Sequence, residues 1–221
     1  MSPVTEVRAV TFDAGGTLIQ PWPSVGHVYA EIAARHGHKF PGALLDQRFA
    51  KVWRGLKNFN HGRDEWAALV DQTFSGLLEP LPSETFFSEL YDRFAEAEAW
   101  RIFDDAKPAL DALAARGIAL AIISNWDERL RPLLDKLKLA KYFDTIVISA
   151  EIGFPKPSPV IFEHTAKKLG LAPEFILHVG DSCEHDKDGA VASGYQYRVI
   201  DRQLEDPREG HIKSLAELWE V

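Results

Sequence analysis

Carboxylate side chains follow apolar segments at two distant places in the sequence. Asp13 comes directly after the β-rich run 7–12, Asp181 follows the run 175–179 after one glycine, and Asp186 lies five residues further on. A carboxylate at the end of a strand is held on a rigid scaffold and faces a cleft. Several such groups in one cleft repel each other unless a cation lies between them. Since no cluster of Cys or His accompanies them, the residue types favour a hard divalent cation over zinc.

A second set of polar side chains occupies comparable positions. Ser124 and Asn125 follow the nearly unbroken apolar run 118–123, and Lys156 lies in a loop of sequence Gly-Phe-Pro-Lys-Pro. The carboxyl ends of parallel strands meet at one edge of a sheet, and ligands bind there. We therefore expect Ser124, Asn125 and Lys156 to lie close to the carboxylates.

The elements that would position these residues alternate between strand and helix. Apolar runs typical of strands covered on both faces occur at 7–12, 118–123, 145–149, 175–179 and 196–200. Helical patterns lie between them, including 160–169 and 184–193, and a short terminal helix is expected over 212–218. Such alternation predicts an α/β fold with a Rossmann-like parallel sheet and helices on both faces. We assign this core domain to residues 1–20 and 101–221.

The segment 21–100 has a different pattern. It contains four amphipathic stripes at helical spacing, the first preceded by Ser24 as a candidate N-cap. We expect a smaller all-helical domain inserted after the first strand. Its tryptophans at helical spacing favour core positions, and some of them, with Arg54, Lys57 or Arg63, are candidates to line a substrate cleft.

Composition narrows the class of protein. The chain has 221 residues, a formal net charge of −8 and a single cysteine, Cys183. The acidic balance without a basic stripe argues against a nucleic-acid partner, and one cysteine excludes an internal disulfide. No apolar run approaches the length of a membrane span and no secretory leader is recognisable, so we expect no membrane association and a cytoplasmic location.

Four short motifs, in order, resemble those of the haloacid dehalogenase-like (HAD) hydrolase superfamily. They are Asp13-x-x-Gly16-Thr17-Leu18, Ser124-Asn125, Lys156-Pro157 and Gly180-Asp181-Ser182-x-x-x-Asp186-x-x-Gly189-Ala190. Together they extend over the chain outside the helical insert, and that insert resembles the mobile cap of the family. The resemblance implies a Mg²⁺-dependent hydrolase acting on a small phosphorylated compound.

The resemblance also implies roles for the acidic residues and the metal. Asp13 would be the nucleophile that forms an aspartyl-phosphate, which water then cleaves. Mg²⁺ would be held by the Asp13 carboxylate, the backbone carbonyl of Gly15 and Asp181, where it stabilises charge on the phosphoryl oxygens.

The remaining positions would hold the phosphate and support the lysine. Ser124 and the backbone amide of Asn125 would bind non-bridging oxygens, and Lys156 would neutralise both nucleophile and phosphate. Asp186 would orient Lys156 or a metal-bound water, with Thr17 in the same supporting layer.

Gly15 departs from the family pattern. Most phosphatases of the family carry a second Asp at this position, as general acid for the leaving alkoxide and base for the water. A glycine offers no such side chain, and general acid–base help is worth about 10²–10⁴-fold. We therefore expect weak hydrolysis of alkyl phosphates and better turnover of aryl or acyl phosphates.

Two alternative functions remain. Dehalogenases of the superfamily also lack the second Asp, but the metal-free members carry Ser, Asn and Tyr where this chain has Asp181, Cys183 and Phe162. A catalytically weak HAD protein that serves as a binding module is the other alternative, and Gly15 is the feature that favours it. Near the motifs, we expect Asp127 to cap a helix, His185 to face solvent and Cys183 to be an unreactive structural residue.

Overall fold

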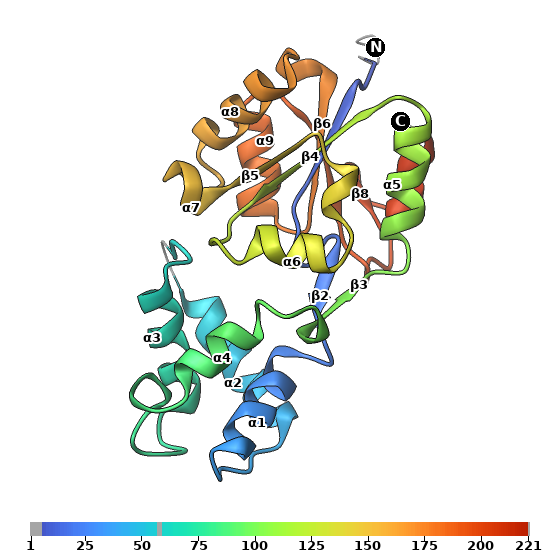
Figure 1. Cartoon of the computed structure of the whole chain (residues 1–221). Coiled ribbons are helices and arrows are strands. Elements are labelled where there is room, and N and C mark those ends of the chain that lie inside the picture. The colour runs from blue at the N-terminus through green and yellow to red at the C-terminus, as the bar shows by residue number, and fades with distance from the viewer. Residues whose placement is uncertain (1–5, 57–58, 221) are drawn as a thin grey trace. The chain divides into compact units, whose positions relative to one another are not determined.

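A computed structural model of the chain describes residues 6–56 and 59–220 (Figure 1). The chain divides into two compact units. The first comprises Met1–Ile19 and Ile102–Val221, and the second comprises Gln20–Arg101. Each unit has its own buried apolar core.

The first unit contains a six-stranded sheet in which every neighbouring pair of strands runs parallel. In spatial order the strands are β5 (Thr145–Ile148), β4 (Ala119–Ser124), β1 (Ala9–Phe12), β6 (Ile176–Gly180), β7 (Gln196–Ile200) and β8 (His211–Ile212). All residues of β1 and β6 are buried, because helices cover both faces of the sheet. The expected Rossmann-like parallel sheet is confirmed.

Among the described residues of this unit, five α-helices surround the sheet. They are α5 (Ala106–Ala115), α6 (Leu130–Lys136), α7 (Ser149–Ile152), α8 (Pro159–Leu169) and α9 (Asp188–Ala192). Figure 1 shows α8 and α9 on one side of the sheet and α5 on the other. In α8, Ser158 supplies the N-cap, Pro159 occupies the first turn and Gly170 ends the helix in a left-handed conformation, which is a strong local signal for helix boundaries.

Three predicted elements differ from the structure by more than one residue at a boundary. The first strand begins at Ala9 rather than at residue 7. The helix expected over 184–193 starts as a π-helical turn, Cys183–Lys187, which precedes α9. The terminal helix expected over 212–218 is a 3₁₀ helix that starts at Leu215, because Ile212 pairs with β7 as part of β8.

The second unit is helical. Its helices are α1 (Val25–Arg35), α2 (Gly42–Gly55), α3 (Arg63–Phe74) and α4 (Phe87–Arg93), with 3₁₀ turns at Pro82–Glu84 and Ala97–Ala99. The side chain of Ser24 accepts a hydrogen bond from the His27 amide and so caps α1 as predicted. Tyr29 and Phe74 are buried in the core of this unit and stack at a centroid distance of 5.9 Å.

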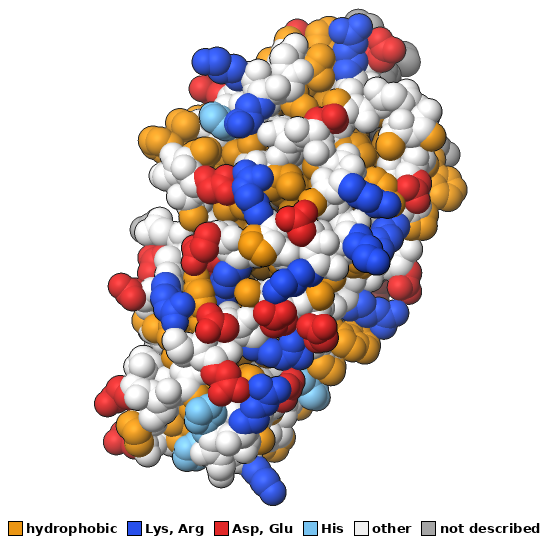
Figure 2. Space-filling view, in the orientation of Figure 1, with side chains coloured by type: hydrophobic (Ala, Val, Ile, Leu, Met, Phe, Trp, Pro, Cys, Tyr) orange, Lys and Arg blue, Asp and Glu red, His pale blue; other side chains and the backbone are white. Residues whose placement is uncertain are grey.

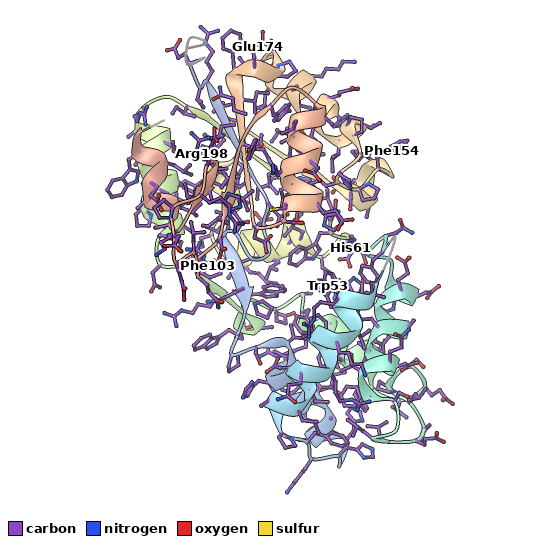
Figure 3. The ribbon with its side chains drawn as sticks, turned by 180° about the vertical axis from the view of Figure 1, so that it is seen from behind. Trp53, His61, Phe103, Phe154, Glu174 and Arg198 are labelled. Atoms are coloured by element: carbon purple, nitrogen blue, oxygen red, sulfur yellow. The ribbon has the colours of Figure 1, made fainter. Side chains whose placement is uncertain are left out.

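Part of the aromatic content of this unit is exposed rather than buried. Trp53 on α2 is 41% exposed and stacks on Trp66 of α3, with ring centroids 6.0 Å apart. Figure 3 shows Trp53 beside His61, and their ring centroids are 6.4 Å apart. Lys57 lies outside the described residues.

A two-stranded sheet, not expected from the sequence, occurs where the chain passes between the units. Its strands are β2 (Ile19–Pro21) and β3 (Trp100–Ile102). The boundaries of the two units fall inside these strands, after Ile19 and after Arg101.

The surface carries both signs of charge. On the face seen in Figure 2, acidic and basic side chains are interspersed. Within residues 6–56 and 59–220, no helix combines the length and apolar character that crossing a membrane requires.

Candidate active site

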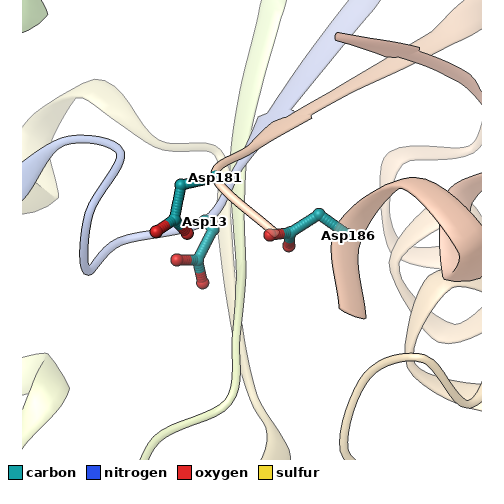
Figure 4. A group of neighbouring side chains, drawn as sticks. All are labelled: Asp13, Asp181 and Asp186. Carbon is teal, nitrogen blue, oxygen red and sulfur yellow. The ribbon is translucent and has the colours of Figure 1, made fainter. Parts of the chain in front are cut away.

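Three carboxylates meet at the carboxyl edge of the core sheet. Asp13 directly follows β1, Asp181 follows β6, and Asp186 lies in the π-helical turn. One oxygen from each lies within 4.8 Å of the others, and Figure 4 shows the three groups together. The strand register explains this, because Phe12 pairs with Val179 on β6, so that both strands end at the same level.

Lys156 is the cation in this cluster. Its Nζ donates to Asp13 Oδ1 at 2.7 Å and to Asp186 Oδ1 at 2.5 Å. The lysine is 3% exposed and Asp186 is 2% exposed, so both ions are removed from water. Buried ions persist only when paired and hydrogen-bonded, and each oxygen named here has a partner.

Ser124 ends β4, on the other side of β1, and Asn125 directly follows it. Ser124 Oγ donates to Asp13 Oδ1 at 2.9 Å. The Asn125 side chain bonds the lysine loop twice: its Nδ2 donates to the Lys156 carbonyl at 2.9 Å, and its Oδ1 accepts from the Lys156 amide at 2.6 Å. The asparagine side chain therefore fixes the loop that carries Lys156, which the sequence did not indicate.

The cluster shifts the pKa values of its members in different directions. Burial, aided by the charges of Asp13 and Asp186, raises the pKa of Asp181 to about 7, although Asp181 reaches solvent. Burial raises the pKa of Asp186, but the Lys156 charge and the hydrogen bonds from His178 and Lys156 together outweigh it and hold that pKa well below its usual range. Burial also disfavours the charged form of Lys156, yet Asp13 and Asp186 raise its pKa overall.

In the Asp13–Lys156 ion pair, Asp13 is the partner whose charged form is disfavoured. Burial raises its pKa, Lys156 lowers it and Asp186 raises it, and the net direction is upward. Lys156 has two carboxylate partners, whereas Asp13 has one ammonium partner and the like charge of Asp186 nearby. Asp186 also accepts from His178 Nε2 and the Ser182 amide.

The residues present fit a divalent cation. When ionised, three carboxylates against one ammonium leave a net charge of −2, which one divalent ion would balance. Both Asp186 oxygens already accept hydrogen bonds from protein groups. Among the described residues, Asp13 Oδ2 accepts no hydrogen bond from another residue, and neither does the Asp181 carboxylate. Asp13 and Asp181 are therefore the side chains suited to bind a hard metal ion, which prefers oxygen ligands.

The turn after Asp13 is shaped around Asp181. Gly16 has φ +79°, and a Cβ there would lie 2.2 Å from Asp181 Oδ2, so only glycine fits. Gly15 lies in the same turn. Thr17 is fully buried, and its hydroxyl has no hydrogen-bond partner among the described residues, while its carbonyl accepts from Arg202.

Three neighbouring residues complete the comparison with the sequence. Asp127 does not occupy the N-cap of α6; Arg129 does, and Asp127 accepts from the Arg129 amide and pairs with its guanidinium at 2.6 Å. His185 is exposed, as expected, and Cys183 is exposed rather than a packed structural residue.

The sequence did not indicate two residues that hydrogen-bond to each other next to this cluster. His178 in β6 is fully buried, and its Nε2 lies 3.0 Å from Asp186 Oδ1. Its Nδ1 lies 2.8 Å from the hydroxyl of Thr11 in β1. The signal was present, because a histidine inside the otherwise apolar run Ile176–Gly180 needs hydrogen-bond partners.

Comparison with known proteins places these motifs in context. The family model described as haloacid dehalogenase-like hydrolase matches residues 7–194. The chain is 31% identical to the human haloacid dehalogenase-like hydrolase domain-containing protein 3, over 96% of this chain and 92% of that protein. It is 28% identical to the phosphoglycolate phosphatase of Salmonella typhi, over 88% and 81% of the two chains. The crystal structure of a HAD phosphatase from Thermococcus onnurineus matches with a TM-score of 0.70 at 25% identity, covering 97% of each chain.

Proposed function

The chain belongs to the haloacid dehalogenase-like hydrolase family and is a phosphatase-like hydrolase, and on that premise we propose that Asp13 attacks the phosphorus of a small phosphorylated compound. The observation that carries the proposal is the convergence of Asp13, Lys156 and Asp181 at one sheet edge. A carboxylate beside a buried ammonium is suited to approach an anion, because the lysine offsets the repulsion between them.

The first step transfers the phosphoryl group to Asp13. A carboxylate oxygen of Asp13 forms a bond to phosphorus while the bond from phosphorus to the leaving oxygen breaks, and the leaving group departs with that electron pair. Ser124 and Lys156 hold the carboxylate in place before attack. Together with the backbone amide of Asn125, they would then bind phosphoryl oxygens.

The second step returns the enzyme to its starting state. Water attacks phosphorus and loses a proton to solvent, the bond from phosphorus to Asp13 breaks with its electron pair returning to the carboxylate, and inorganic phosphate is released. Mg²⁺, held by Asp13, Asp181 and the Gly15 carbonyl, would neutralise charge on the phosphoryl oxygens when bound. Asp186 keeps Lys156 beside Asp13 throughout. Thr17 would stiffen the turn that carries Gly15.

We assign residues 21–100 the role of a substrate-selecting cap. A helical unit with its own core can move as a body, which would admit substrate and exclude water. Exposed aromatic side chains such as Trp53 are candidates to contact the leaving group.

A panel of phosphorylated metabolites with Mg²⁺, repeated with EDTA, tests the proposal. We expect Mg²⁺-dependent release of phosphate that EDTA abolishes and that Asp13→Asn removes. Halide release from 2-haloacids that persists in EDTA would instead indicate a dehalogenase, against which the Asp181 charge argues. If folded protein that binds Mg²⁺ released phosphate from no compound of the panel, this result would favour the binding module, the alternative that Gly15 supports.

A further inference from the structure

His178 is a buried titratable group that the proposed reaction steps do not use. His178 lies in the middle of β6 and is fully buried, with its ring edge-on to Phe162 at a centroid distance of 5.1 Å. Both ring nitrogens have partners, Thr11 on one side and Asp186 on the other. Thr11 and His178 are paired in the β1–β6 register, which brings their side chains together. The ring therefore connects the sheet interior to the catalytic lysine.

The partners determine which nitrogen carries the proton. Asp186 is ionised beside Lys156, and a carboxylate only accepts, so His178 Nε2 must donate. Burial lowers the pKa of His178 and keeps the ring neutral. In a neutral ring with the proton on Nε2, Nδ1 is an acceptor, and the Thr11 hydroxyl must donate to it. The hydrogen bonds thus run in one direction from Thr11 to Asp186.

Asp186 is fixed by the donors around it. Oδ1 accepts from His178 and Lys156, and Oδ2 accepts from the Ser182 amide at 3.0 Å. Lys156 Nζ in turn bridges Asp186 and Asp13. Together with the loop that Asn125 holds, the orientation of the Asp186 carboxylate therefore sets where the ammonium lies relative to the nucleophile. Without the histidine donor, this carboxylate would have one fewer anchor.

We infer that His178, held as the Nε2–H tautomer by Thr11, is a positioning residue that orients Asp186 and through it places Lys156 against Asp13. The effect of His178 on turnover rests on the proposed function, whereas the assignment of its tautomer does not. The histidine touches no substrate atom in this role. Removing a residue that supports the groups around a reactive centre typically changes activity by about 10–100-fold.

A matched pair of substitutions separates positioning from packing. Gln at position 178 can keep an N–H donor toward Asp186, whereas Leu fills similar space without one. With p-nitrophenyl phosphate and Mg²⁺, we expect His178→Leu to lower kcat about 10–100-fold with a smaller change in KM, and His178→Gln to recover most of that loss. Equal activity of the Gln and Leu variants, after both are shown to fold, would overturn the inference.

A second pair keeps the test valid if the His178 variants fail to fold. Thr11→Val removes the hydroxyl donor at nearly constant volume, and Thr11→Ser retains it. We expect the Val variant to lose turnover and the Ser variant to resemble the unaltered protein. Full activity of Thr11→Val would contradict the role given to the Thr11 hydroxyl.

Nitrogen-15 NMR of the imidazole rings supplies a readout that needs no turnover. His178 is expected to give the neutral Nε2–H pattern near pH 7, assigned by its loss in His178→Gln, and Thr11→Val is expected to shift the Nδ1 signal. An imidazolium or an Nδ1–H ring would overturn the inference. If no phosphate ester were hydrolysed while the Nε2–H pattern was present, the proposed function would fail and the hydrogen-bond chain would stand.

Discussion

The Trp126 indole packs against Gly15, so that a Cβ added at position 15 would lie 3.1 Å from Trp126 Cζ3. That separation is shorter than ordinary van der Waals contact, and any larger side chain would need the indole to move. The absence of a side chain at position 15 and the placement of the Trp126 indole are therefore linked by this contact. A side chain at position 15 therefore requires the Trp126 indole to shift by a few tenths of an ångström.

The first prediction concerns this pair. Gly15→Asp alone should not increase hydrolysis of alkyl phosphates, because its side chain meets the indole. Gly15→Asp combined with Trp126→Ala should be faster on an alkyl phosphate than Trp126→Ala alone, with a gain toward the low end of the approximate 10²–10⁴ range for general acid–base help. Initial rates of phosphate release with Mg²⁺ measure both.

The Trp126→Ala variant with native Gly15 is the matched control for this comparison. It shows what removing the indole does by itself. If Gly15→Asp alone already gave the full gain, the indole would not be the obstacle described above.

A second prediction concerns the leaving group. Without an acid at position 15, the leaving oxygen must depart with little proton transfer. We expect kcat/KM to fall steeply as the leaving-group pKa rises along a series from substituted phenyl phosphates to alkyl phosphates. A series measured with the Gly15→Asp, Trp126→Ala double variant should give a shallower slope. Equal rates for an alkyl phosphate and p-nitrophenyl phosphate in the unaltered protein would contradict the expectation.

The third prediction follows from Asp181, whose pKa burial raises to about 7. An unfolded Asp has a pKa of about 3.9, so ionising Asp181 opposes folding. This cost is absent below about pH 4 and complete above about pH 7. Metal-free Asp181→Asn should therefore melt at a higher temperature than the unaltered protein near pH 8, and the two should converge as the pH falls.

Mg²⁺ should reverse the order of the melting temperatures of Asp181→Asn and the unaltered protein. Added Mg²⁺ is expected to raise the melting temperature of the unaltered protein near pH 8, by binding the folded state, and to do so less in Asp181→Asn. The Mg²⁺ effect should weaken below about pH 7, where protons compete for Asp181. Thermal shift assays across this pH range measure each curve, and an identical Mg²⁺ response in both proteins would exclude Asp181 as a ligand.

The fourth prediction concerns the buried lysine. Lys156→Met would leave the Asp13 and Asp186 charges without their counter-ion, and breaking a buried pair in this way costs about 3–5 kcal/mol in the free energy of unfolding. Adding Asp186→Asn to Lys156→Met should recover part of the loss, because one stranded charge is removed. Urea unfolding of the two single variants and the double variant near pH 8 measures the coupling. Strictly additive losses would show that the pair does not interact.

Much of the site could be predicted from the sequence because its members end buried strands. The apolar runs before Asp13, Ser124 and Asp181 indicate strands covered on both faces, and parallel strands bring their carboxyl ends to one edge. The parallel sheet could be predicted in the same way. The nearness of Lys156 to Asp13 was expected from the loop motif that resembles the family, because the lysine does not stand at a strand end.

Other features depend on contacts that no local pattern encodes. Thr11 and His178 are 167 residues apart in the sequence and become neighbours only through the β1–β6 register. The contact between Trp126 and Gly15 likewise depends on the path of a loop and a turn after different strands.

The sequence by itself therefore determined which residue types stand at the ends of which strands, because strands buried on both faces form continuous apolar runs. It also determined that acidic groups would need a balancing cation. Only the tertiary structure decided that Asn125 holds the lysine loop and that His178 supports Asp186. The reason is physical: hydrogen-bond partners are chosen by distance and direction in space, and those are set when strands far apart in the chain align.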